Sequence, residues 1–212
     1  MILFAHRGFW RTEEEQNSIE ACSRASRNGF GIEVDVHSID GKLVVSHDPP
    51  KIAGPHVLLR DLLERFSSNG GSHVAINVKQ DGLATLLKAE TSDFEDLTCF
   101  AFDMSLPELL KYRASSLDFA VRFSEYEESV DSQLVDGAAA LWIDSFHDEW
   151  WSIEALTEFG NLNHKALITI VSPELHLREP YKAWEELRKF ADQSDRVALC
   201  TDLLEEALDF FR

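Results

Sequence analysis

The stretch GIEVDVH at residues 31–37 places an apolar side chain at every second position and a polar one between. Successive side chains of a strand point to opposite faces, so this alternation predicts a strand whose polar face carries Glu33, Asp35 and His37. The pair Asp40-Gly41 that follows is typical of a hairpin turn into a second strand over residues 42–47. We therefore expect a strand with two chemically different faces over residues 31–37.

Short β-branched or aromatic runs alternate with longer amphipathic stretches on both sides of this strand. The expected strands are residues 2–5, 31–37, 73–79, 98–104, 118–123, 139–146, 165–171 and 197–201. The expected helices include residues 58–66, 83–90, 149–159 and 181–191. Such alternation predicts a parallel sheet, and eight units in one chain predict an α/β fold, a single (β/α)8 TIM-type barrel domain over residues 1–212.

The composition indicates a globular protein with an acidic surface. The chain has 212 residues, 44% of them hydrophobic, and a formal net charge of -18. Such a charge repels nucleic-acid backbones and anionic membranes, so we expect no nucleic-acid partner. No stretch is long and apolar enough for membrane insertion, and three cysteines make no disulfide framework. We expect a cytoplasmic protein with a small-molecule substrate.

Polar residues collect where the expected strands end. His6 and Arg7 follow the first strand, His47 follows the hairpin, and Asn77 and Lys79 share one face of the strand at 73–79. Later strands end near Asp103, Arg122, Asp144, Ser172, Glu174 and Asp202. Because the active site of such a barrel lies at the carboxyl ends of its strands, this clustering predicts an enzyme.

Glu33 and Asp35 form the first candidate pair. Residues two apart on a strand point the same way, roughly 7 Å apart, and two carboxylates in one buried volume repel unless a cation lies between them. Hard oxygen ligands from a few side chains suit Mg²⁺ or Ca²⁺. The alternative is two solvated acids on an edge strand. We expect His37, on the same face, to support the site without taking part in the chemistry.

His6 and His47 form the second candidate pair. A histidine can give or take a proton near neutral pH, and a displacement at phosphorus needs one group of each kind. Arg7, Lys79 and Arg122 could hold a phosphoryl group, although each is also a residue type that forms surface ion pairs.

Five segments of the first 50 residues then carry a family resemblance. They are HRG at 6–8, QNSIEA at 16–21, IEVDV at 32–36, DG at 40–41 and VVSHD at 44–48. Together they resemble the glycerophosphodiester phosphodiesterases. The resemblance implies a TIM-type barrel, a divalent metal (Mg²⁺ or Ca²⁺) and a small phosphodiester substrate, cleaved with a cyclic phosphate intermediate.

The resemblance also implies roles for individual residues. It places the metal on Glu33 and Asp35, acid–base catalysis on His6 and His47, and phosphate contact on Arg7 and Lys79. In one respect the sequence departs from the family, whose members usually carry an acidic residue two positions before the lysine of the third main strand. Asn77 stands there, so we expect it as an uncharged metal ligand, or else Asp103 contributes.

Two other functions remain open at this point. Loss of a metal carboxylate at Asn77 is compatible with a non-catalytic ligand-binding barrel derived from the same family. Lys79 could in principle form a Schiff base in metal-assisted carbonyl or sugar chemistry.

Overall fold

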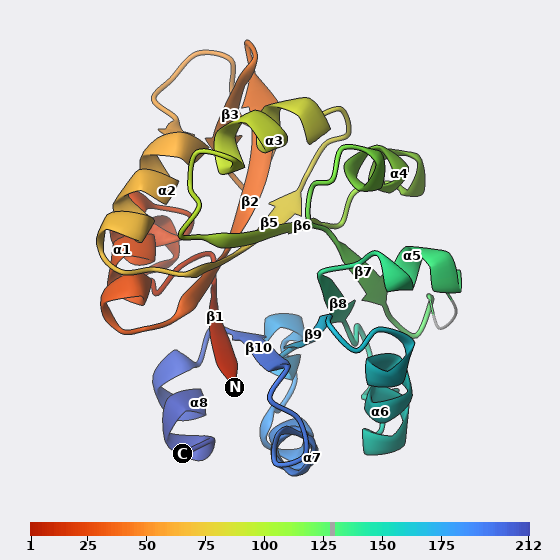
Figure 1. Cartoon of the computed structure of the whole chain (residues 1–212). Helices are drawn as coiled ribbons and strands as arrows, with labels where there is room; N and C mark the ends of the chain where they lie inside the picture. Colours follow the sequence, from red (N-terminus) through yellow and green to blue (C-terminus); the bar gives the residue numbers. More distant parts are fainter. Residues whose placement is uncertain (128–129) are drawn as a thin grey trace. The chain divides into compact units, whose positions relative to one another are not determined.

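The computed structural model describes residues 1–127 and 130–212, which form two compact units. One unit is Phe4–Phe119, and the other is Met1–Leu3 together with Ala120–Arg212. In each unit parallel strands alternate with helices (Figure 1). Within the described residues, no helix has the length and apolar character needed to cross a membrane.

The unit Phe4–Phe119 is built around one central strand. Its strands are β1 (Ile2–His6), of which Ile2 and Leu3 belong to the other unit, β2 (Gly31–Ile39), β3 (Lys42–Val45), β4 (Val57–Leu58), β5 (His73–Val78) and β6 (Thr98–Phe102). β2 pairs in parallel with β1 on one side and β5 on the other, and β5 pairs in parallel with β6. The second half of β2 also pairs with β3 in the antiparallel hairpin. β2 is therefore an interior strand along most of its length.

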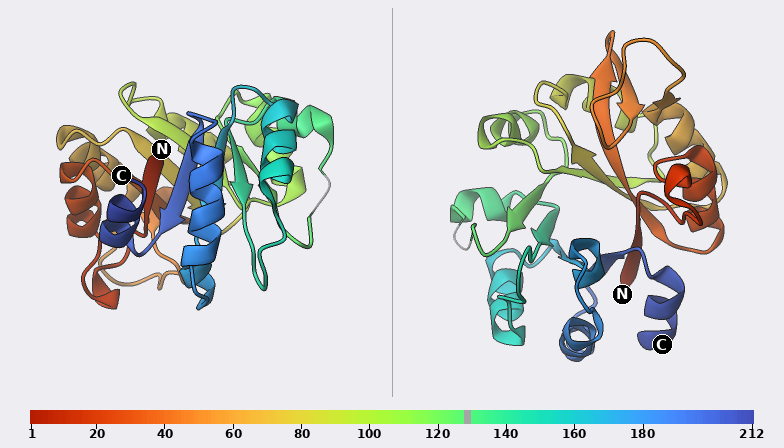
Figure 2. Two further views of the ribbon diagram at one scale, coloured as in Figure 1. Left: turned by 90° about the horizontal axis from the view of Figure 1, so that it is seen from below. Right: turned by 180° about the vertical axis from the view of Figure 1, so that it is seen from behind.

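Helices cover this set of strands. They are η1 (Glu13–Glu15), α1 (Ile19–Arg27), α2 (Leu59–Ser68), α3 (Ala84–Thr91) and α4 (Leu106–Ala114). α1 begins where it does because the side chain of Ser18 accepts the backbone N–H of Ala21 at 3.1 Å, a cap that contributes about 1 kcal/mol. α1 and α2 lie side by side (Figure 2), and α2 buries Leu59, Leu62 and Phe66.

The other unit repeats the strand–helix alternation. Its strands β7 (Ala120–Phe123), β8 (Ala140–Ile143), β9 (Leu167–Val171) and β10 (Val197–Thr201) are parallel and neighbours in that order. The helices are α5 (Ser132–Asp136), α6 (Ile153–Leu162), η2 (Pro173–His176), α7 (Tyr181–Ala191) and α8 (Leu204–Phe210). Trp184 of α7 is fully buried, and its Nε1 donates to the Ser172 hydroxyl at 2.8 Å.

The eight expected strands are all present in the described residues, with shifted ends in some cases. The strand expected over 139–146 ends at Ile143, and the helix expected from residue 149 begins at Ile153. The residues between them are occupied by local hydrogen bonds: Trp150 Nε1 donates to the carbonyl of Asp144, and Ser152 caps α6. The apolar pattern extends into this connection because Trp151 is buried and Trp150 is partly buried.

Gly8 fixes the turn that follows β1. Its φ is +88°, and a Cβ atom there would lie 2.9 Å from the Cβ of Ala21 in α1. Both the backbone conformation and the close approach of α1 therefore require glycine. This turn sets the place of α1 relative to the end of β1.

We expect Gly8→Ala to lower the free energy of unfolding by about 2–4 kcal/mol, the combined cost of left-handed backbone and overpacking. Gly29→Ala is the matched control, because Gly29 has φ +77° but no described atom lies within 4 Å of the place that its methyl group would take. The control should cost only about 1 kcal/mol in urea unfolding followed by tryptophan fluorescence. Equal losses in the two variants would show that the approach of α1 imposes no constraint.

Candidate active site

The polar face of β2 lies between polar residues of its two neighbours. In the strand register, His6 of β1 is beside Glu33, and Asn77 of β5 is beside Asp35. Side chains of adjacent residues across a sheet project from the same face. The carboxyl ends of three consecutive parallel strands thus bring one imidazole, two carboxylates and one amide together.

Both carboxylates are buried. Glu33 is 2% exposed and Asp35 is 1% exposed. The alternative of two solvated acids on an edge strand is therefore wrong. Glu33 is paired with β1 and β5, and Asp35 is paired with β5 on one side while its carbonyl accepts the Ser46 N–H at 3.0 Å. A buried carboxylate needs hydrogen bonds or a cation to remain ionised.

Asp35 has such partners on both oxygens. Lys79 Nζ lies 3.1 Å from Oδ1, and Arg7 Nε lies 3.1 Å from Oδ2. Asn17 Nδ2 donates to Oδ2 at 2.8 Å, and the backbone N–H of Asp35 donates to Asn17 Oδ1 at 3.2 Å. Asp35 is thus fixed in place by one amide and compensated by two cations.

Arg7 and Asn17 reach Asp35 through unusual backbone conformations. Their φ angles are +57° and +58°, in the left-handed region that residues other than glycine seldom adopt. The N–H of Asn17 donates to the carbonyl of Arg7 at 2.8 Å, and the N–H of Arg7 donates to Glu33 Oε2 at 3.2 Å. Strain of this kind is concentrated at functional sites. Reasoning from the sequence missed the role of Asn17; its position in the QNSIEA segment was the available signal.

The two carboxylates titrate in opposite directions. Burial raises the pKa of Glu33 to about 7, the charge of Asp35 adds to this rise, and His6 and Arg7 oppose it. Burial also acts to raise the pKa of Asp35. The ammonium of Lys79, the hydrogen bond from Asn17 and the charge of Arg7 outweigh that effect and lower it. At neutral pH Asp35 is ionised, whereas Glu33 is close to its midpoint.

His47 lies in the loop after β3. Its Nδ1 is 2.8 Å from Asp48 Oδ1, and its carbonyl oxygen is 3.4 Å from Nε2 of the buried His37. The His47 side chain is 48% exposed. Asp48 therefore orients the ring, which is open to a ligand, and His37 contacts the backbone of this loop.

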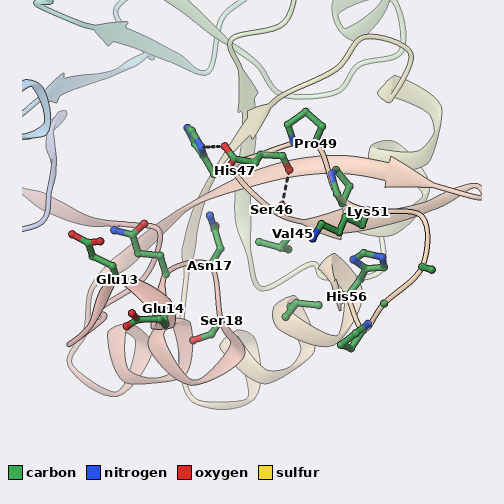
Figure 3. Close-up of a pocket in the computed structure, with 17 residues that line it drawn as sticks. Glu13, Glu14, Asn17, Ser18, Val45, Ser46, His47, Pro49, Lys51 and His56 are labelled. Atoms are coloured by element: carbon green, nitrogen blue, oxygen red, sulfur yellow. Dashed lines mark hydrogen bonds and ion pairs between the residues drawn. The ribbon is translucent and has the colours of Figure 1, made fainter.

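A cavity of about 650 Å³ adjoins His47 (Figure 3). Asn17, which binds Asp35, also lines it, so the cavity borders the carboxylate cluster. Figure 3 shows Glu13 and Glu14 on one side of the cavity and Lys51 and His56 on the other. The Nε2 atom of His56 is buried and has no hydrogen-bond partner among the described residues.

Two further residues singled out in the sequence lie apart from this cluster in the chain. Arg122 belongs to the other unit, where its Nε is 2.7 Å from Glu127 Oε2. Asp103 is exposed just after β6, with φ +65°. Phosphate contact by Arg122 and metal binding by Asp103 both stay predictions.

The donor set at the carboxylate cluster fits a hard divalent cation. Glu33 and Asp35 supply carboxylate oxygens, and the Oδ1 atom of Asn77 is buried with no hydrogen-bond donor from the part of the chain that the structure describes. An amide oxygen with no donor is available as a ligand. In residues 1–127 and 130–212, no group of three His, Cys, Asp or Glu side chains is arranged to hold a metal ion, so the amide of Asn77 would have to complete the set.

Comparison with known proteins gives matches in structure alone. The sequence matches no family model and no curated protein. The structure is similar to a glycerophosphodiester phosphodiesterase from Parabacteroides distasonis, with 18% identity, TM-score 0.68, and coverage of 99% of this chain and 96% of that one. It is similar to such an enzyme from Agrobacterium tumefaciens, with 18% identity, TM-score 0.67, and coverage of 100% and 98%.

Other enzymes share the fold less closely. Tryptophan synthase from M. tuberculosis has a TM-score of 0.56 and 17% identity, and the match covers 99% of this chain and 87% of that one. These likenesses confirm the predicted α/β fold, a (β/α)8 TIM-type barrel. The family resemblance of the first 50 residues is matched by a likeness of fold along nearly the whole chain. Because all these identities are low, the activity has to be argued from the site.

The pKa of Glu33 makes a prediction about stability and pH. Its pKa is about 7 in the folded protein and ordinarily 4.5, so between these values the folded state binds more protons than the unfolded state. The stability that this difference supplies is present below about pH 4.5 and is lost as the pH rises through about 7.

We therefore expect Glu33→Gln to lose less stability than the parent protein between about pH 5 and about pH 8. Urea unfolding in metal-free buffer at a series of pH values measures this difference. Glu95→Gln is the control, because Glu95 is an exposed acid of the same unit. Parallel stability curves for the parent protein and Glu33→Gln would contradict the raised pKa.

Proposed function

We propose that this protein is a metal-dependent phosphodiesterase that cleaves a small, glycerophosphodiester-like substrate. One observation carries the proposal: Arg7 and Lys79 lie 3.1 Å from a buried carboxylate on a strand that also presents Glu33. Cations next to hard oxygen donors form a combination suited to phosphate, which binds both kinds of group. The likeness in fold to glycerophosphodiester phosphodiesterases supports the same function.

In this proposal Glu33, Asp35 and Asn77 would hold Mg²⁺ or Ca²⁺. The bound cation would supply stabilisation of the negative charge that develops on the phosphate oxygens. Arg7 and Lys79 bind and orient the phosphate, and Arg122 is proposed as a further contact. A guanidinium can make two parallel hydrogen bonds to phosphate, whereas an ammonium acts as a point charge.

His6 and His47 then act as the acid–base pair. One imidazole removes the proton from the attacking oxygen, which is either the substrate's own neighbouring hydroxyl or water. The other gives a proton to the alkoxide that leaves phosphorus. Attack by the neighbouring hydroxyl yields a cyclic phosphate and the free alcohol. Asp48 binds Nδ1 of His47 at 2.8 Å, which leaves Nε2 for proton transfer.

The cavity beside His47 is where we place the alcohol part of the substrate. Its volume of about 650 Å³ is within the usual range for small-molecule sites. Most of its lining residues are polar, charged or proline, although Val45, Ala53 and Val57 also line it, and among the described residues no aromatic side chain other than histidine does so. A polar alcohol fits this lining better than an acyl chain does.

Partners and location follow from the same features. The net charge of -18 disfavours nucleic acid and anionic membrane surfaces. Among the described residues Cys22, Cys99 and Cys200 form no disulfide, and the burial of Cys22 raises its pKa. Cysteines that form no disulfide suit a reducing compartment, so we propose a cytoplasmic location.

We expect His6→Ala and His47→Ala each to reduce the turnover of a glycerophosphodiester by about 10²- to 10⁴-fold. The reason is that each variant removes one of the two proton-transfer groups. His164→Ala, at an exposed histidine of the other unit, should keep full activity. Release of the alcohol is measured with and without Mg²⁺. Full activity in either active-site variant would rule out that residue as acid or base.

Asn77 is the observation that favours a second candidate function, a non-catalytic ligand-binding barrel. An amide brings no charge to the metal site, so cation affinity is lower than with three carboxylates. Calorimetric titration with Mg²⁺ separates the two candidates. It is carried out on the parent protein, Asn77→Glu and Asn77→Gln, and Asn77→Gln is the uncharged control whose side chain has the same length as that of glutamate.

We expect millimolar Mg²⁺ to bind the parent protein and to bind Asn77→Glu more tightly, because the variant adds a carboxylate. Asn77→Gln should show no such gain. The binding barrel would be supported instead if Mg²⁺ bound only to Asn77→Glu and no diester were turned over by the parent protein.

A further inference from the structure

Asp35 is held by the same two cations that the proposed function assigns to phosphate. Lys79 Nζ is 3.1 Å from its Oδ1, and Arg7 Nε is 3.1 Å from its Oδ2. The Asp35 side chain is 1% exposed, so salt and water screen these contacts weakly. The proposed function also gives this carboxylate to the divalent metal. The two cations and the proposed metal ion therefore compete for the same oxygens of Asp35.

We infer that the ion pairs of Asp35 couple metal binding to phosphate binding, so that each ligand raises the affinity for the other. With Lys79 beside Oδ1, a metal ion that approaches this oxygen meets an ammonium charge at close range, which weakens its binding. A phosphate group draws Lys79 and Arg7 toward itself and leaves the charge of Asp35 for the metal. This inference rests on the proposed function and describes how its site is regulated.

Asn17 allows this exchange without movement of the carboxylate. It donates to Asp35 Oδ2 at 2.8 Å and accepts the Asp35 backbone N–H at 3.2 Å, and neither contact involves a charge that phosphate would attract. Asn17 is itself only 7% exposed. The carboxylate thus keeps its position while its cationic partners change theirs.

The two cations are also placed to make the exchange. The side chains of Arg7 and Lys79 are 21% and 24% exposed, so each contacts Asp35 and can still reach a ligand from solvent. Arg7 has a second contact, from Nη1 to Gln16 Oε1 at 3.1 Å. Because the two binding equilibria are linked, the metal must raise the affinity for phosphate by the same factor by which phosphate raises the affinity for the metal.

Direct contact between phosphate and metal would also produce coupling, so the experiment has to separate the two causes. Lys79→Met does so, because it removes the competing ammonium even when no phosphate is present. Under our inference this variant binds metal more tightly than the parent protein in the absence of phosphate. Under direct contact alone it does not.

The test is calorimetric titration of the whole protein with Mg²⁺, with and without saturating glycerol 3-phosphate, corrected for the heat of their mixing. For the parent protein we expect at least about fivefold tighter Mg²⁺ binding with glycerol 3-phosphate. For Lys79→Met we expect part of that gain already without glycerol 3-phosphate, and a smaller further gain on its addition, because the ion pair of Arg7 with Asp35 remains. Lys42→Met removes an exposed lysine charge from the same unit and should behave like the parent protein.

Two results would overturn the inference: equal Mg²⁺ affinity of Lys79→Met and Lys42→Met without phosphate, or no Mg²⁺ binding by the parent protein under either condition. If Lys79→Met does not fold, Lys79→Gln takes its place. In addition, titration of the parent protein with glycerol 3-phosphate must show that Mg²⁺ raises the affinity for glycerol 3-phosphate by the same factor by which glycerol 3-phosphate raises the affinity for Mg²⁺. Diester hydrolysis is assayed separately. Coupling without hydrolysis would refute the proposed function alone, and hydrolysis without coupling would refute this inference alone.

Discussion

The unit Phe4–Phe119 is organised around one constraint, the burial of the Asp35 carboxylate. Moving an ionised carboxylate out of water costs several kcal/mol even after relaxation, unless partners meet both of its oxygens. Here the partners come from three separate segments: Arg7 after β1, Asn17 before α1, and Lys79 after β5. Satisfying one side chain thus ties together the ends of two strands and the start of a helix.

The same requirement explains the strained backbone at the start of the chain. Arg7 and Asn17 both adopt left-handed conformations, each at a cost of about 1–2 kcal/mol. The hydrogen bond from Asn17 to the ionised Asp35, worth about 1.5–3 kcal/mol, and the ion pair of Arg7 with the same carboxylate offset this cost. Gly8 follows directly and lets α1 approach, which brings Asn17 to Asp35 of β2. Strain, close packing and the carboxylate network belong to one local arrangement.

Much of the fold could be predicted because the spacing of apolar residues along the sequence indicates directly which side chains are buried. The alternation at residues 31–37 gives β2, and the apolar stripe of residues 181–191 gives α7 with the same bounds. Whether β2 was an edge strand could not be predicted, since that depends on which strands pair with it. The contact between Asn17 and Asp35 was hidden for a related reason: it needs a positive φ at an asparagine, and asparagine is also common in ordinary turns and caps.

Glu33 and Asp35 share a face and are two residues apart, yet their surroundings differ in kind. Asp35 receives two cations and an amide donor, so it is ionised in the folded protein. Glu33 is equally buried but accepts the backbone N–H of Arg7, a weaker form of compensation, and its pKa rises to about 7. The charge of Asp35 is therefore compensated in the folded protein, whereas Glu33 still lacks positive charge. A divalent cation held by the proposed ligands Glu33, Asp35 and Asn77 would supply that charge, so the charge deficit of the fold lies at the site proposed for the chemistry.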